Sequence, residues 1–136
     1  MEFISVEEFL EQPEEVQEIF LSWFNENVWA YDLVQEEDII MLYKDYVEER
    51  ISVEYDSYPL FTEGQLRRFI EDKTGYHLEI STEFGTGFYI ADFYKNNKSN
   101  RPGRMMIKTQ ETDLLQAYWK VACEIAKESV ENGKNN

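Results

Sequence analysis

The sequence LFTEGQLRRFIEDKTG, from Leu60 to Gly75, carries helix signals at both of its ends. Thr62 is a good N-cap, because its hydroxyl can accept a hydrogen bond from the Gln65 amide while the Gln65 side chain reaches back to the Thr62 amide. Gly75 can adopt the left-handed conformation that ends a helix without a side-chain clash. We therefore predict a helix between Thr62 and Gly75, and this helix separates two halves of different character.

The two halves differ in charge. Residues 1–60 contain 17 Asp and Glu residues against only Lys44 and Arg50, a net of −15, whereas residues 61–136 contain 11 acidic and 11 basic residues. An acidic field repels DNA, RNA and anionic membranes, and it attracts cationic surfaces. A solvated surface that keeps the protein in solution is the plainer explanation of the same charge.

The composition is that of a folded chain. With 136 residues, 43% of them hydrophobic and 15% aromatic, we expect residues 1–136 to form a single domain with its own core. The sequence contains no run of about 18 apolar residues, so no membrane span is predicted. The segment from Met1 to Glu8 lacks the basic and apolar regions of a signal peptide. The single cysteine, Cys123, excludes an internal disulfide. A cytoplasmic protein is the expected result.

The acidic half (1–60) has the spacing of helices. Ser5 and Glu8 form a second capping box, which predicts a short helix running towards Gln12. A second helix follows Pro13, and a third is predicted from about Gln35 to Glu49. Their apolar stripes are Val16, Ile19, Phe20, Trp23 and Phe24, then Ile39, Leu42, Tyr43, Tyr46 and Val47. We further expect a short strand or extended arm at 51–55 and a turn at 57–59.

The second half changes to the period of strands. Leu78, Ile80, Thr82 and Phe84 alternate with polar residues, which predicts a half-buried strand over 76–84. Gly85 to Gly87 supplies a turn, and strands over 88–95 and 104–109 complete a meander. A last helix is predicted over 112–130, before a frayed tail at 131–136. The predicted fold class is α+β, with N-terminal helices, a three-stranded antiparallel meander and a C-terminal helix packed on the sheet.

No residue pattern predicts catalysis. His77 is the only histidine, and Cys123 lies in a helix among apolar residues, where a buried inert thiol is typical. His77, Glu79 and Glu83 share one strand face, but they lack the spacing of a metal site, and a solvated strand face explains them better. The turn at Gly85 is too short for a phosphate loop. We therefore expect no enzyme and no cofactor.

The segment from Lys95 to Arg104 is rich in basic and Asn residues. Such a loop could contact phosphates, although the acidity of the whole chain opposes nucleic-acid binding. A solvated hairpin loop is the commoner explanation. Contact with the acidic half of a second copy is another, and the oligomeric state stays open.

Aromatic and acidic residues outside the clean helical stripes form a candidate partner-binding surface. Apolar anchors beside carboxylates are what an interface for a cationic protein needs, since the rings supply affinity and the charges steer the encounter. The candidate residues are Trp29, Tyr31, Glu36, Glu37, Asp38, Asp45, Glu48, Glu49, Glu54, Tyr55, Asp56 and Tyr58.

Three parts of the chain resemble one family. Residues 4–23, 59–75 and 113–126 look like those of an uncharacterised family of small phage and prophage proteins of Gram-positive bacteria. That family has no assigned activity, so the resemblance carries over no site residue. It implies an accessory protein acting in the cytoplasm of a bacterial host. Residues 24–57 match poorly and are where this chain could have its own binding role.

Two classes of function follow. The first is a phage-encoded acidic inhibitor that binds a basic protein, such as a nucleic-acid-handling enzyme of bacterial defence, with nucleic-acid mimicry as one mechanism and anti-CRISPR proteins as one subclass. The alternatives are a small-molecule binder or enzyme with a pocket between sheet and helices, and a self-associating accessory protein of phage replication or assembly. Neither direct nucleic-acid binding nor membrane binding is expected.

Overall fold

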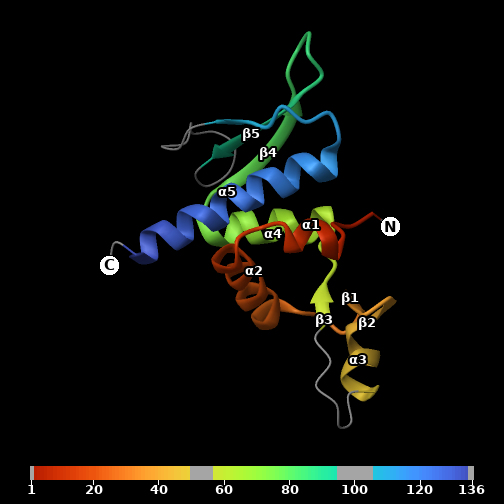
Figure 1. Cartoon of the computed structure of the whole chain (residues 1–136). Coiled ribbons are helices and arrows are strands. Elements are labelled where there is room, and N and C mark those ends of the chain that lie inside the picture. Colours follow the sequence, from red (N-terminus) through yellow and green to blue (C-terminus); the bar gives the residue numbers. More distant parts are fainter. Residues whose placement is uncertain (1, 50–56, 95–105, 135–136) are drawn as a thin grey trace. The chain divides into compact units, whose positions relative to one another are not determined.

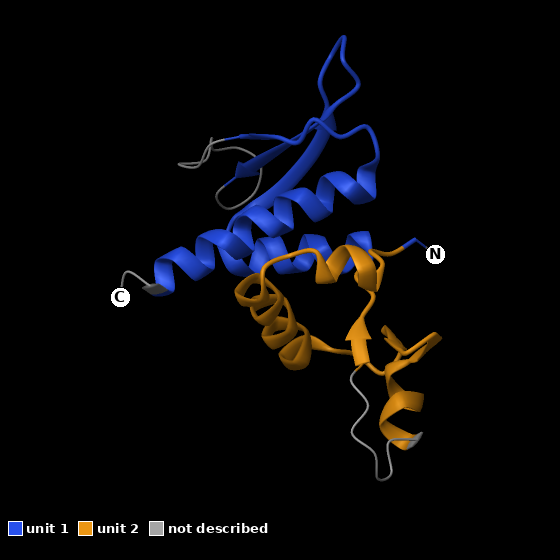
Figure 2. Ribbon diagram, in the orientation of Figure 1, with its two compact units in different colours: residues 1–2, 62–136 blue, residues 3–61 orange. Residues whose placement is uncertain are grey.

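A computed structural model describes residues 2–49, 57–94 and 106–134 (Figure 1). The chain divides into two compact units (Figure 2), residues 3–61 and residues 62–136 together with residues 1–2. This division falls one residue from the predicted border between the acidic half and the charge-balanced half. The prediction of a single domain stays a prediction.

Residues 3–61 combine helices with a small sheet. Strand order in this sheet is β2-β1-β3, and both strand pairs are antiparallel. The elements in chain order are α1 (Val6–Leu10), α2 (Glu14–Asn27), β1 (Leu33–Glu36), β2 (Ile39–Leu42), α3 (Tyr43–Glu49) and β3 (Ser57–Pro59).

The start of α1 confirms the predicted capping box. The Glu8 amide donates to Ser5 Oγ at 3.1 Å, and the Ser5 amide donates to Glu8 Oε1 at 3.4 Å. The Ile4 amide donates to the Phe61 carbonyl at 2.8 Å, so the residue before the cap is joined to the end of the unit. Local hydrogen bonds therefore fix where α1 begins.

An aromatic cluster forms the core of residues 3–61. Phe9, Phe20, Phe24 and Phe61 are all buried, and the Phe61 ring centroid lies 5.5–6.3 Å from those of the other three. Tilted and edge-on rings at this separation attract each other beyond the burial of their area. The predicted stripe on α2 is confirmed in Phe20 and Phe24, which both join the cluster.

The predicted helix over Gln35–Glu49 is wrong in its first half. The hairpin of β1 and β2 occupies Leu33 to Leu42, and only Tyr43–Glu49 are helical. Pairing of β1 with β3 explains the difference, because a partner distant in sequence stabilises the strand against a helical spacing. Residues 57–59, predicted as a turn, are β3 itself. The strand predicted at 51–55 lies outside the described residues.

The second unit contains two long helices and the predicted meander. Strand order is β4-β5-β6, and each pair is antiparallel. Helix α5 packs against α4 and β5, and α4 also contacts β4. The elements are α4 (Glu63–Thr74), β4 (His77–Thr82), β5 (Tyr89–Tyr94), β6 (Ile107–Lys108) and α5 (Leu114–Lys134).

Helix α4 has both of its predicted ends. The Gln65 amide donates to Thr62 Oγ1 at 3.4 Å, and the Thr62 amide donates to Gln65 Oε1 at 2.9 Å. Gly75 has a φ of 74°, and its amide donates to the Glu71 carbonyl at 2.8 Å. The N-cap and C-cap predicted from sequence are confirmed.

Several boundaries in this unit differ from prediction, among them the ends of β4 and α5. Strand β4 ends at Thr82, so Phe84 lies in the turn with its side chain fully exposed instead of on a buried strand face. Helix α5 continues to Lys134, because residues 131–134, predicted as a frayed tail, extend its last turn. The α+β class, the meander and the C-terminal helix on the sheet are confirmed; the sheet in residues 3–61 was not predicted. None of the described helices is long and apolar enough to cross a membrane.

Candidate partner-binding surface

The connector after α2 presents two aromatic side chains to solvent. Trp29 is 65% exposed and Tyr31 is 71% exposed. The backbone between them is held, since the Trp29 amide donates to Asp32 Oδ2 at 2.8 Å and the Asp32 amide donates to the Trp29 carbonyl at 3.1 Å. The Lys44 amide donates to the Ala30 carbonyl at 2.9 Å. These hydrogen bonds fix the backbone that carries the two exposed rings, which lowers the backbone entropy that binding would cost.

The β1–β2 hairpin carries three carboxylates at its tip. Glu36 pairs with Ile39 across a two-residue turn made by Glu37 and Asp38, and both turn residues are exposed. The Gln35 side chain donates from Nε2 to the Glu37 carbonyl at 2.8 Å, which helps to close the turn. The tip is therefore a compact acidic group on an ordered backbone.

The exposed rings and the acidic tip lie at opposite ends of one hairpin. The Tyr43 amide donates to the Asp32 carbonyl at 2.7 Å, which closes the end of the hairpin next to Tyr31. The four residues of β1 between this end and the turn span about 13 Å. Both groups therefore fit within one protein interface of ordinary size, about 800 Å² on each partner.

Helix α3 adds one cation beside the exposed rings. Lys44 Nζ lies 5.4 Å from the centroid of the Tyr31 ring, within range of a cation–π interaction. Lys44 is the one basic residue in the described part of residues 3–61. It lies at the aromatic end of the hairpin, next to Tyr31, whereas Glu37 and Asp38 lie at the other end.

The remaining predicted residues divide into three groups. On α3, Glu48 is exposed and Asp45 half-buried, while Glu49 is the last residue of the helix. Tyr58 is half-buried on β3, with its ring 6.0 Å from that of the buried Phe9, so it belongs to the core edge and we leave it out of the surface. Glu54, Tyr55 and Asp56 lie outside the described residues. We define the hairpin surface as Trp29, Tyr31, Glu36, Glu37, Asp38, Ile39 and Ile40.

Ile39 and Ile40 were not predicted as part of this surface. The helical interpretation placed Ile39 on a buried stripe, whereas the structure leaves it 61% exposed and Ile40 49% exposed. The signal that could have found them is the run of two β-branched residues directly after an acidic pair, which is typical of a strand after a turn. They place apolar area next to the acidic tip.

The turn residue Glu37 is strained, which gives a first testable prediction. Its φ is 56°, a left-handed conformation that costs a residue with a side chain about 1 kcal/mol. We expect Glu37→Gly to raise the free energy of unfolding by about 1 kcal/mol in urea denaturation. Glu37→Ala is the control, because it removes the charge and keeps the Cβ. An equal gain in both variants would assign the effect to charge and contradict the backbone explanation.

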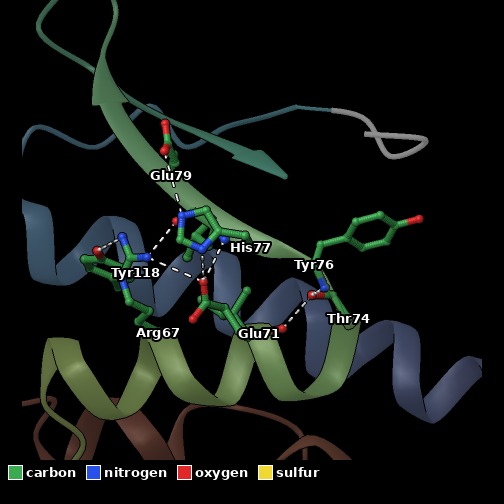
Figure 3. Close-up of polar contacts among 9 residues, drawn as sticks. Arg67, Glu71, Thr74, Tyr76, His77, Glu79 and Tyr118 are labelled. Carbon is green, nitrogen blue, oxygen red and sulfur yellow. Dashed lines mark hydrogen bonds and ion pairs between the residues drawn. The ribbon is translucent and has the colours of Figure 1, made fainter. Parts of the chain in front are cut away.

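A second polar cluster, in residues 62–136, surrounds the only histidine (Figure 3). Glu71 Oε2 on α4 accepts a hydrogen bond from the Leu78 amide at 2.8 Å and lies 3.1 Å from His77 Nδ1. His77 Nε2 lies 3.8 Å from the Glu79 carboxylate, where a catalytic triad would need a hydroxyl or thiol. The sequence does not predict this cluster, because packing of α4 against β4 brings its members together. The geometry is that of a structural junction.

Arg67 completes the same junction. Its guanidinium donates from Nη1 to the Leu78 carbonyl at 2.6 Å and from Nη2 to Tyr118 Oη at 3.2 Å. Glu71 and Arg67 therefore satisfy both backbone groups of Leu78, on the side of β4 that has no neighbouring strand (Figure 3). This closes the edge of the sheet at Leu78.

The other candidate chemistry gains no geometric support. Cys123 is buried, and this burial raises the pKa of its thiol to about 12, against a smaller lowering by Lys127, so the reactive thiolate is scarce near neutral pH. Glu83 lies 3.6 Å from Lys108 Nζ. Across the described ranges, no three His, Cys, Asp or Glu side chains are grouped to hold a metal ion. The basic segment 95–104 lies outside those ranges.

Among the described residues, a shallow depression lies at the start of α4. It has a volume of about 400 Å³ and is lined by Glu2, Thr62, Glu63 and Gly64. Sites for small molecules are lined mainly by apolar and aromatic side chains. The depression therefore gives no support to the small-molecule alternative.

Comparison of this chain with protein-family models, with curated proteins and with solved structures gives no match. The geometry and charge of the hairpin surface are therefore the basis on which a function can be proposed.

Proposed function

We propose that the protein is a non-enzymatic binding protein that engages a basic protein through the hairpin surface. One observation carries the proposal: two exposed aromatic rings lie directly before a hairpin whose tip carries three carboxylates. Exposed Trp and Tyr supply most of the affinity in many interfaces, whereas charges around them speed association and select the partner.

The charge of the whole unit supports the same kind of partner. Residues 3–61 contain 16 Asp and Glu residues against Lys44 and Arg50. Such a field attracts a cationic protein over about one Debye length, roughly 8 Å at physiological salt. Proteins that handle nucleic acids present cationic surfaces for phosphates. We therefore propose that the target is a nucleic-acid-handling enzyme, and that the protein inhibits it by occupying its nucleic-acid site. The specific form of this proposal is a phage protein directed against a bacterial defence nuclease.

Self-association through the hairpin surface is the less favourable alternative. A second copy would bring Glu37 and Asp38 towards carboxylates of the same sign, which opposes pairing.

The proposal is tested by affinity capture from bacterial lysate, read by mass spectrometry, with and without nuclease. We compare the natural chain with a variant carrying Glu37→Lys and Asp38→Lys. The matched control carries Glu11→Lys and Glu18→Lys, which change the net charge equally at exposed positions near and on α2. We expect a basic protein that survives nuclease treatment, is retained by the control and is lost by the hairpin variant. Equal recovery by both variants, or no basic protein at low salt, would contradict the proposal.

A further inference from the structure

We propose that the outer edge of β2 binds an extended basic segment of the partner as an additional antiparallel or parallel strand. This inference rests on the proposed function and names its mode of contact. It starts from the direction of the backbone groups in β2 (Ile39–Leu42), which lies at the end of its sheet in the order β2-β1-β3.

The hairpin register assigns these directions. Hydrogen-bonded and non-hydrogen-bonded pairs alternate along an antiparallel ladder. The Tyr43 amide donates to the Asp32 carbonyl, so the pair of Val34 with Met41, two positions further, is also hydrogen-bonded, and the pair of Gln35 with Ile40 is not. The N–H and C=O of Ile40 therefore point away from β1. Within the described ranges, neither group has a backbone partner in another element.

Two other sheet edges are each protected at one described position, whereas no such protection is seen at Ile40 of β2 within the described residues. On β3, the Leu60 amide donates to the Leu33 carbonyl at 3.1 Å, so Pro59 occupies the outward position and has no N–H to offer. On β4, Glu71 and Arg67 bind the outward groups of Leu78. Edge strands commonly carry such protection, because an open edge pairs with other chains.

The side chains of β2 also suit an added strand. Ile39 and Ile40 are consecutive, so they lie on opposite faces of the sheet, and both are exposed. An added strand would cover apolar area on both faces while its backbone pairs with Ile40. Strand addition of this kind obtains affinity from main-chain hydrogen bonds and specificity from side chains.

The charge next to β2 indicates which kind of segment would bind its outer edge. Glu37 and Asp38 lie directly before Ile39 and are exposed. A second copy of β2 would place like charges together, and an acidic peptide would do the same. An extended segment with lysine or arginine beside β-branched residues complements both the carboxylates and the isoleucines.

The test uses a capped, fluorescent hexapeptide of alternating lysine and valine, with binding to the full chain measured by anisotropy at low salt. Two derivatives carry N-methyl groups at alternate residues: one on the amides of the lysines, the other on the amides of the valines. Charge and side chains are therefore the same in all three peptides. A strand pairs through one set only, so we expect one derivative to bind about tenfold more weakly and the other to bind like the parent. Equal affinities of all three peptides, or no binding of the parent peptide, would overturn strand addition.

A variant of the protein gives the reciprocal measurement. Ile40→Pro removes the outward N–H without removing a hydrogen bond to β1, whereas Ile40→Val keeps that N–H. We expect about tenfold weaker peptide binding for the proline variant and a change below about twofold for the valine variant. Unchanged binding by Ile40→Pro would count against the inference. Suppose that Ile40→Pro leaves peptide binding unchanged, but that the Glu37→Lys and Asp38→Lys variant still fails to capture the basic protein from lysate. The proposed function then stands, and only strand addition as the mode of contact is wrong.

Discussion

Phe61→Ala should lower the free energy of unfolding by about 3–5 kcal/mol, the largest effect we expect from a single substitution. Phe61 is fully buried, and its ring contacts those of Phe9, Phe20 and Phe24. Alanine would leave a cavity at the centre of this cluster and remove three ring–ring contacts, each worth about 0.5–1.5 kcal/mol beyond buried area. Urea denaturation followed by circular dichroism measures the change.

Phe84→Ala is the matched control for this experiment. It removes the same side chain from the fully exposed tip of the β4–β5 turn, and we expect a change within about 0.5 kcal/mol. A loss below about 1 kcal/mol for Phe61→Ala would contradict the aromatic core of residues 3–61. A large loss for Phe84→Ala would mean that this side chain is covered.

Trp29→Ala should weaken binding of the basic partner by about 30-fold, which corresponds to about 2 kcal/mol. Trp29 is exposed, and its backbone N–H and C=O are both hydrogen-bonded to Asp32, so the backbone that carries the ring needs little further ordering on binding. Titration of the purified partner by calorimetry gives the dissociation constant. The free energy of unfolding should change little, because an exposed ring contributes little to folding.

Two further variants separate the role of the ring from other effects. Tyr31→Phe keeps the ring next to Lys44 and should bind within about threefold of the natural chain, whereas Tyr31→Ala should resemble Trp29→Ala. Phe84→Ala removes an exposed ring from the charge-balanced unit and should leave binding unchanged. Equal losses in Trp29→Ala and Phe84→Ala would place the interface elsewhere.

Local signals explain most of what the sequence predicted correctly. The capping boxes at Ser5 and Thr62 and the left-handed Gly75 depend on residues within one helical turn, so they can be identified without knowledge of the fold. The alternation around Leu78 and the glycines near Gly85 likewise predicted the β4–β5 hairpin.

The β1–β2 hairpin could not be predicted for two physical reasons. Its turn places Glu37 at positive φ without the Gly or Asn that usually marks such a turn. Its apolar residues also match a helical spacing by coincidence, and β1 gains its second neighbour, β3, from residues 57–59. Tertiary pairing therefore outweighed the local pattern.

The candidate surface was predicted in part. Exposure of Trp29 and Tyr31 follows from their place outside the apolar stripes, and the acidic residues follow from composition. That Tyr58 contacts Phe9, and that Ile39 and Ile40 lie in solvent, depends on strand pairing and was not predicted.

Salt dependence of binding is the most direct test of an acidic surface that engages a basic protein. The measurement is the dissociation constant of the captured complex from about 50 mM to about 200 mM salt, with the Glu11→Lys and Glu18→Lys variant as charge-matched control for the hairpin variant. We expect the natural chain and the control to lose affinity steadily as salt rises, and the Glu37→Lys and Asp38→Lys variant to bind weakly with a shallower slope. A dissociation constant that does not change with salt would contradict the account.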